Sequence, residues 1–162
     1  MHTATRSIFH RRNLGGAALL VLTLSLQPYC YAGGGGNLIP DEQLLATMEL
    51  RAQQSNPRDQ AFLYADLADK MSLLLSKQMR DGDMQRAELT MQRMEHYSEL
   101  IENDVKQNSK GLKKAEMLLH DTNRRLTDIA RSVSGDLRPR VQESIKRLDN
   151  AQRSLLTQVF SK

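Results

Sequence analysis

The spacing of apolar residues between Met84 and Val133 is the feature that most limits how this chain can fold. Apolar side chains recur there in steps of three and four residues. Twelve of the fifteen positions in this register are apolar, whereas the thirty-five residues between them include only six apolar side chains. A 3,4 spacing of this length predicts the seam of a coiled coil or of a long helical hairpin. The seam positions are Met84, Ala87, Met91, Met94, Ser98, Ile101, Val105, Asn108, Leu112, Ala115, Leu119, Thr122, Leu126, Ile129 and Val133.

The segment from Gln107 to Gly111 leaves two architectures open. Ser109 could cap a new helix, which would give a compact bundle of four long helices. Alternatively, one helix continues, because an asparagine or a lone glycine destabilises a helix interior by about 1 kcal/mol or less without ending it. The apolar register is unbroken across this segment, and Asn108 lies on the seam. We therefore expect one long central helix over about 83–134, with Asn108 fixing its register against a partner.

Start and stop signals define the other helices. Asn56 followed by Pro57 is typical of a helix N-terminus, and Gly82 and Gly135 are suited to ending one. The predicted helices cover residues 41–54, 57–80 and 137–160. Because short connections make neighbouring helices antiparallel, the expected fold is all-α, with elongated antiparallel hairpins in a coiled-coil-like bundle. In this arrangement the second and third of these helices flank the two halves of the central helix.

The first 32 residues have the composition of an export signal. Three arginines form a positive n-region, and residues 14–26 form an apolar h-region. This run is shorter than the roughly 20 apolar residues that a membrane-spanning helix needs. We therefore predict cleavage between Ala32 and Gly33 and a mature protein that is periplasmic or secreted. The predicted domains are a signal peptide (1–32), a flexible glycine-rich leader (33–40) and a single all-helical domain (41–162).

Loss of the signal changes the charge balance. The whole chain has 23 basic and 19 acidic residues, and the three signal arginines leave 20 basic and 19 acidic residues in the mature chain. Such a balance is not typical of a nucleic-acid-binding protein. However, residues 41–105 have 7 basic and 13 acidic side chains, whereas residues 106–162 have 13 and 6. Since an elongated molecule with opposite charges at its ends complements a second copy, we expect an antiparallel homodimer, or a complex with another envelope protein.

The basic half also contains a candidate interface. Its residues are Lys110, Lys113, Lys114, Arg124 and Arg125. Lipid head groups or cell-wall polymers are anionic partners that such a surface could meet. Interleaved acidic side chains dilute its charge, so contact with a membrane surface is the weaker expectation.

Motifs typical of catalysis are missing from the sequence. It contains neither a nucleophile elbow nor a glycine-rich phosphate loop. We therefore predict a non-enzymatic protein without catalytic, cofactor-binding or metal-binding residues. Glu116 and His120, four residues apart on one helix face, leave a metal-binding bundle as an alternative, although a di-iron bundle needs repeated Glu-x-x-His pairs.

Methionine supports a second alternative function. Seven methionines follow the predicted signal, and Met84, Met91 and Met94 lie on the apolar seam, where filling the core is the ordinary role. A groove lined by methionines would suit a holdase-like chaperone that binds unfolded clients.

From Asn56 onward, the chain resembles a group of small exported proteins from acidobacteria. The similarity rests on Asn56-Pro57-Arg58-Asp59, Leu63-Tyr64-Ala65-Asp66-Leu67, the Gly82 turn, Leu112-Lys113-Lys114-Ala115-Glu116-Met117-Leu118 and Val159-Phe160. This resemblance implies export into a Gram-negative envelope and an all-helical fold, and it assigns no functional residues. The sequence as a whole predicts an exported helical interaction or scaffold protein that associates with itself.

Overall fold

The computed structural model describes residues 39–105 and 109–161, which form five α-helices and no strand. The helices are α1 (Glu42–Gln54), α2 (Pro57–Asp81), α3 (Met84–Asp104), α4 (Leu112–Ser132) and α5 (Leu137–Phe160). The predicted all-α class is confirmed. Residues 36–162 form one compact unit. The predicted signal peptide, its cleavage site at Ala32 and Gly33, and the seam residue Asn108 lie outside the described residues.

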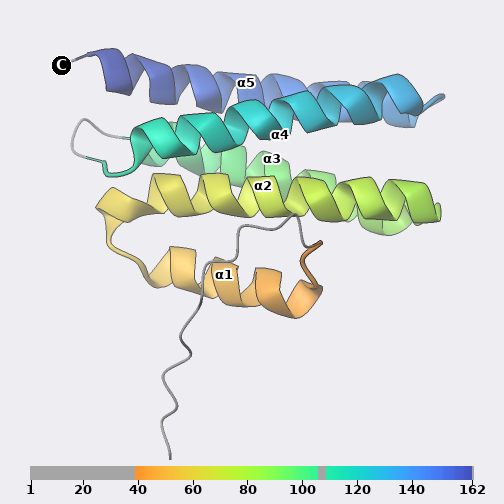
Figure 1. Ribbon diagram of the computed structural model, residues 1–162, viewed down its shortest axis with the longest axis horizontal. Helices are drawn as coiled ribbons and strands as arrows, with labels where there is room; N and C mark the ends of the chain where they lie inside the picture. Colours follow the sequence, from red (N-terminus) through yellow and green to blue (C-terminus); the bar gives the residue numbers. More distant parts are fainter. Residues whose placement is uncertain (1–38, 106–108, 162) are drawn as a thin grey trace, which may run out of the picture. The chain divides into compact units, whose positions relative to one another are not determined.

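Helices α2 to α5 form a four-helix bundle, and α1 packs on the outside of α2 (Figure 1). Helix α2 packs against α3 and α4, and α5 packs against the same two helices. The diagonal pairs are therefore α2 with α5 and α3 with α4. Helices α2 and α3 form one antiparallel hairpin, and α4 and α5 form the other. The two hairpins lie side by side, with α2 parallel to α4 and α3 parallel to α5 (Figure 1).

The prediction of one central helix over residues 83–134 is wrong, because α3 ends at Asp104 and α4 begins at Leu112. Gly111, at the N-cap of α4, has a φ of 68°, which a continuous right-handed helix does not contain. The chain instead returns to the start of α2, where the N–H of Lys110 donates to the carbonyl oxygen of Arg58 at 2.7 Å. The helices over 57–80 and 137–160 therefore do not flank one long helix. The chain forms the compact bundle, with Gly111 in place of Ser109 as the cap.

The apolar register crosses this break because α3 and α4 line the same core. Their seam residues are buried on both sides of the connection. The buried apolar seam residues are Ala87, Met91, Met94, Ile101, Leu112, Ala115, Leu119, Leu126 and Ile129. Since both helices must face one core, each keeps its own 3,4 spacing, and the register alone cannot distinguish two helices from one.

The predicted caps around α2 are confirmed. The side chain of Asn56 accepts a hydrogen bond from the N–H of Arg58 at 3.0 Å, and Pro57 occupies the first helical position. Gly82 ends the helix with a φ of 73°, and Asp83 caps α3. The turn between α2 and α3 is therefore short, as the hairpin requires. None of the described helices is both long and apolar enough to cross a membrane.

Candidate interaction site

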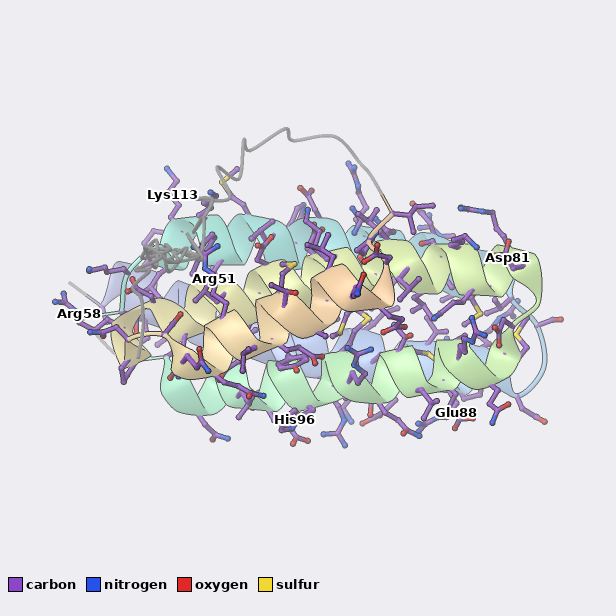
Figure 2. The ribbon with its side chains drawn as sticks, turned by 90° about the horizontal axis from the view of Figure 1, so that it is seen from below. Arg51, Arg58, Asp81, Glu88, His96 and Lys113 are labelled. Atoms are coloured by element: carbon purple, nitrogen blue, oxygen red, sulfur yellow. The ribbon has the colours of Figure 1, made fainter. Side chains whose placement is uncertain are left out.

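Helix α1 lies across the face formed by α2 and α3, outside the four-helix core (Figure 2). Leu45 and Ala52 are fully buried in this contact, and Met48 packs against the core between them. An isolated helix of 13 residues is marginally stable in water. Its contacts with the bundle must therefore stabilise α1, which makes the α2–α3 face a surface that already binds an amphipathic helix.

Arg93 of α3 provides the polar part of this contact. Its Nε lies 3.2 Å from Oε1 of Glu49, and its Nη1 lies 3.0 Å from Oε2 of Glu42. Partial burial alone would lower the pKa of Arg93, but the hydrogen bonds and charges of Glu49 and Glu42 outweigh burial and raise it. One guanidinium thus binds two carboxylates that are two helical turns apart on α1.

Tyr97 lies one turn further along α3 and extends the same contact. Its ring is stacked on that of Tyr64 from α2, with 5.5 Å between ring centroids and 24° between planes. Burial, together with the charge of Glu49 and a hydrogen bond to it, raises the pKa of the Tyr97 hydroxyl. Glu49 therefore interacts with both Arg93 and Tyr97, and this joins α1 to α3.

A surface depression of about 500 Å³ lies beside α1 along α3. It is lined by Glu42, Arg86, Leu89, Thr90, Gln92, Arg93 and His96. Leu89 is 54% exposed in this depression, although it lies in the middle of a helix. We call these residues the α3 depression. It combines one exposed apolar side chain with basic groups, a composition found at protein-binding surfaces.

Sequence reasoning missed this site. The signal was the spacing of Glu42 and Glu49, seven residues apart on the face that also presents Leu45 and Ala52. Carboxylates on the apolar face of a helix indicate a cationic partner on the surface that the helix covers. The spacing does not identify the residue that supplies the cation, because Arg93 is 44 residues from Glu49 in the sequence.

Four of the five residues of the interface predicted from the sequence are exposed, and the fifth, Arg125, is not. Lys110, Lys113, Lys114 and Arg124 are exposed. Arg125 points the other way, and its guanidinium pairs with Asp69 of α2 at 3.0 Å and bonds to Ser72. Arg125 therefore joins α4 to α2. The structure brings the three lysines to the end of the bundle that also holds Arg51 and Arg58, which the sequence analysis did not include. Figure 2 shows Lys113, Arg51 and Arg58 at this end.

The acidic and basic halves of the sequence meet within one chain. Besides the Arg125–Asp69 pair between α4 and α2, Arg147 of α5 lies 2.6 Å from Glu99 and 3.8 Å from Glu95 of α3. Arg140 of α5 lies 3.8 Å from Glu88 of α3. Opposite charges from the two halves of the sequence thus join the two hairpins within one chain. A second copy of the chain is therefore not needed to explain the charge asymmetry. The antiparallel homodimer stays a prediction.

Several residues that suggested a metal-binding bundle or a holdase-like chaperone take part in packing or hydrogen bonds within the bundle. Glu116 accepts a hydrogen bond from Gln152 at 2.9 Å, and no group of three His, Cys, Asp or Glu side chains in the described parts of the chain could hold a metal ion. Met91 and Met94 are fully buried in the core, whereas Met84 and Met117 are exposed on different helices. The metal-binding bundle and the chaperone both stay predictions.

Comparison with protein-family models, with curated proteins and with solved structures finds no match to this chain.

Proposed function

We propose that this protein is an exported, non-enzymatic interaction protein that binds an amphipathic helix of another envelope protein. The observation that carries this proposal is Leu89, half-exposed in the α3 depression beside a helix that the same surface already holds. An amphipathic helix binds such a groove through apolar residues spaced at i, i+3, i+4 and i+7.

The contacts of α1 indicate the chemistry of the partner helix. On α1, apolar Leu45 and Ala52 alternate with carboxylates that bind Arg93. The α3 depression adds Arg86 and His96 on its open side. A partner helix with an apolar stripe bordered by Asp or Glu would place apolar side chains on Leu89 and carboxylates near Arg86.

Export is supported by the sequence of the first 32 residues and by the resemblance to exported acidobacterial proteins. In the envelope, the bundle would present the α3 depression as a rigid helix face, since α3 is held by α2, α5 and α1.

Site-specific photo-crosslinking tests the proposal. A photoreactive phenylalanine analogue replaces Leu89 in the α3 depression, and the control places it at Asp121, an exposed residue of α4, the helix diagonal to α3. We expect position 89 to give one or two discrete adducts that map to an acidic amphipathic helix, and position 121 to give none of them. The substitution Arg86→Glu should reduce the adducts at position 89, and Lys146→Glu, the same charge change on exposed α5 surface, should not.

Identical adducts from both positions, or none from position 89, would contradict the proposal. Adducts with many unrelated proteins at position 89 would favour the holdase-like chaperone instead, because a chaperone binds many unfolded clients.

A further inference from the structure

Five basic side chains converge at one end of the bundle, where α1 ends and α2 and α4 begin. They are Arg51, Arg58, Lys110, Lys113 and Lys114, and all five are exposed. We call them the basic end. Figure 2 shows Arg51, Arg58 and Lys113 at this end and Asp81 at the opposite one. The five residues are up to 63 positions apart in the sequence, so only the fold brings them together.

Backbone contacts hold the basic end in place. The N–H of Lys110 donates to the carbonyl oxygen of Arg58 at 2.7 Å, which ties the start of α4 to the first turn of α2. The ammonium of Lys114 lies 5.0 Å from the centre of the Phe62 ring. The backbone at Lys110 and the side chain of Lys114 are therefore held against α2 by the fold itself.

Acidic groups only partly offset this charge. Asp59, Asp66 and Glu102 lie at the same end, and the first two are half-buried. Asp66 has Lys114 and Arg51 among its charged neighbours. Among the side chains that the structure describes, the more exposed charges at the basic end are therefore predominantly positive, which attracts an anionic partner.

Two exposed apolar side chains distinguish among anionic partners. Leu50, next to Arg51 on α1, is 54% exposed, and Phe160, in the last turn of α5, is 79% exposed. Because Gln152 of α5 bonds to Glu116 of antiparallel α4, Phe160, two turns further along α5, lies about one turn beyond the start of α4, at the same end of the bundle. A soluble polyanion offers no apolar phase for these side chains, whereas the interface of a bilayer accepts Leu and Phe beside Lys and Arg.

We propose that the basic end binds the surface of a bilayer containing anionic phospholipids, with Lys and Arg at the head groups and Phe160 and Leu50 at the acyl boundary. This contact is separate from the α3 depression and does not depend on it. It would hold the bundle against a membrane through one end and leave the side of α3 open to a protein partner.

Vesicle co-sedimentation of residues 36–162, which form a compact unit, tests the proposal. One set of vesicles contains phosphatidylethanolamine and phosphatidylglycerol, and the other contains phosphatidylcholine alone. We expect binding to the anionic vesicles only, weakened by salt. The double variant K110Q/K113Q should bind on the order of 25-fold more weakly, since each basic residue near an anionic surface changes binding roughly fivefold.

The matched control is R131Q/K146Q, which removes two exposed basic side chains away from the basic end. It should bind as the unchanged protein does. Equal losses in both double variants would overturn the proposal, because the attraction would then be a property of net charge.

The variant F160S tests the apolar part, and circular dichroism checks that each variant keeps its helices. We expect weaker vesicle binding by F160S at unchanged salt dependence. Unchanged vesicle binding by F160S would overturn insertion. Binding to soluble polyglutamate without binding to anionic vesicles would overturn the membrane contact and identify an acidic macromolecule as the partner.

Discussion

Arg93 of α3 and Glu49 of α1 form the ion pair that joins the outermost helix to the bundle. The same guanidinium also binds Glu42, so one side chain makes contacts over two turns of α1. Because only Leu45 and Ala52 of α1 are fully buried, this polar contact is a large part of what stabilises the helix in place.

Replacing Arg93 with methionine should therefore loosen α1. We expect the free energy of unfolding to fall by about 1–2 kcal/mol, because partly buried Glu49 and exposed Glu42 lose their shared cation. Urea denaturation measures this loss, and limited proteolysis near Ser55 should become faster as α1 detaches. Arg86→Met is the control, since exposed Arg86 pairs with neighbouring Asp83 and with no other carboxylate in the described parts of the chain, and its replacement should change stability by less than about 0.5 kcal/mol. Equal effects of the two variants would contradict the assigned role of Arg93.

Replacing Gly111 with alanine should destabilise the protein more than the same change at Gly82. Both glycines have left-handed backbone conformations, with φ of 68° and 73°, which cost an alanine about 1–2 kcal/mol. A Cβ at Gly111 would also lie 3.3 Å from the Phe62 side chain, whereas one at Gly82 meets no atom within 4 Å. We expect an additional loss of about 1 kcal/mol at Gly111 for displacing this contact. Similar melting temperatures for the two variants would show that Phe62 moves aside without loss.

Asp66 should make the protein less stable as the pH rises. Burial raises its pKa above the ordinary value of 3.8, and this effect exceeds the lowering by Lys70 and other cations. A carboxyl with a raised pKa stabilises the folded state at pH below 3.8, and this contribution is lost as the pH rises through the folded-state pKa. Asp66→Asn should therefore increase stability at neutral pH relative to the unchanged protein, and the gain should shrink toward pH 3.8.

Asp69→Asn is the matched comparison for Asp66→Asn. Asp69 is buried and pairs with Arg125 at 3.0 Å and with Lys70 at 3.3 Å. Its neutralisation leaves Arg125 without its carboxylate, so we expect a loss of about 2–4 kcal/mol at neutral pH. Urea titrations at several pH values measure both variants. A stability loss in Asp66→Asn at neutral pH would refute the interpretation of its burial.

Reversing the charge of Arg147 should weaken the contact between the two hairpins. Glu95, Glu99 and Glu143 surround this guanidinium, so Arg147→Glu places four carboxylates together. We expect a loss of about 1–2 kcal/mol at low salt, and less at high salt because these side chains are partly exposed. Adding Glu99→Arg should restore part of the stability. Thermal unfolding of the single and double variants gives the coupling energy.

Residues 36–162 should sediment with the mass of one chain at both low and high salt. Part of the charge that made a second copy attractive is already neutralised by ion pairs between α2 and α4 and between α3 and α5. Analytical ultracentrifugation at about 50 and about 500 mM salt measures the mass, because screening separates charge-driven association from other kinds. A dimer that dissociates at high salt would instead support the antiparallel homodimer predicted from the sequence.

Local signals predicted most of the helix boundaries. Asn56, Pro57 and Gly82 act through their own backbone and capping groups, so their positions could be read without knowing the fold. The end of α3 could not be read this way. The same apolar register results from one helix over 84–133 and from two helices that face one core. Gly111 differs from a glycine tolerated inside a helix only in its φ and in its contact with Phe62, and neither can be read from the sequence.

The candidate sites depended on contacts between distant residues. Arg124 and Arg125 are neighbours in the sequence. Arg125 is directed toward Asp69 and Arg124 toward solvent, and only the packing of α4 on α2 determines which of the two arginines is paired. Similarly, Arg51 and Arg58 join the three lysines only because the chain returns to α2 after α3. Charge counts along the sequence could not show whether opposite charges would meet within the chain or across an interface.

The side-by-side arrangement of the α2–α3 and α4–α5 hairpins bears on how the architecture could grow. Stacked hairpins can be extended into arrays when the last one offers an apolar surface to the next. Here α4 and α5 end the stack with exposed His120, Asp121, Arg124, Lys146 and Asn150. A third hairpin would have to bury these polar and charged groups, which costs free energy unless each finds a new partner, so this surface disfavours extension of the stack beyond two hairpins.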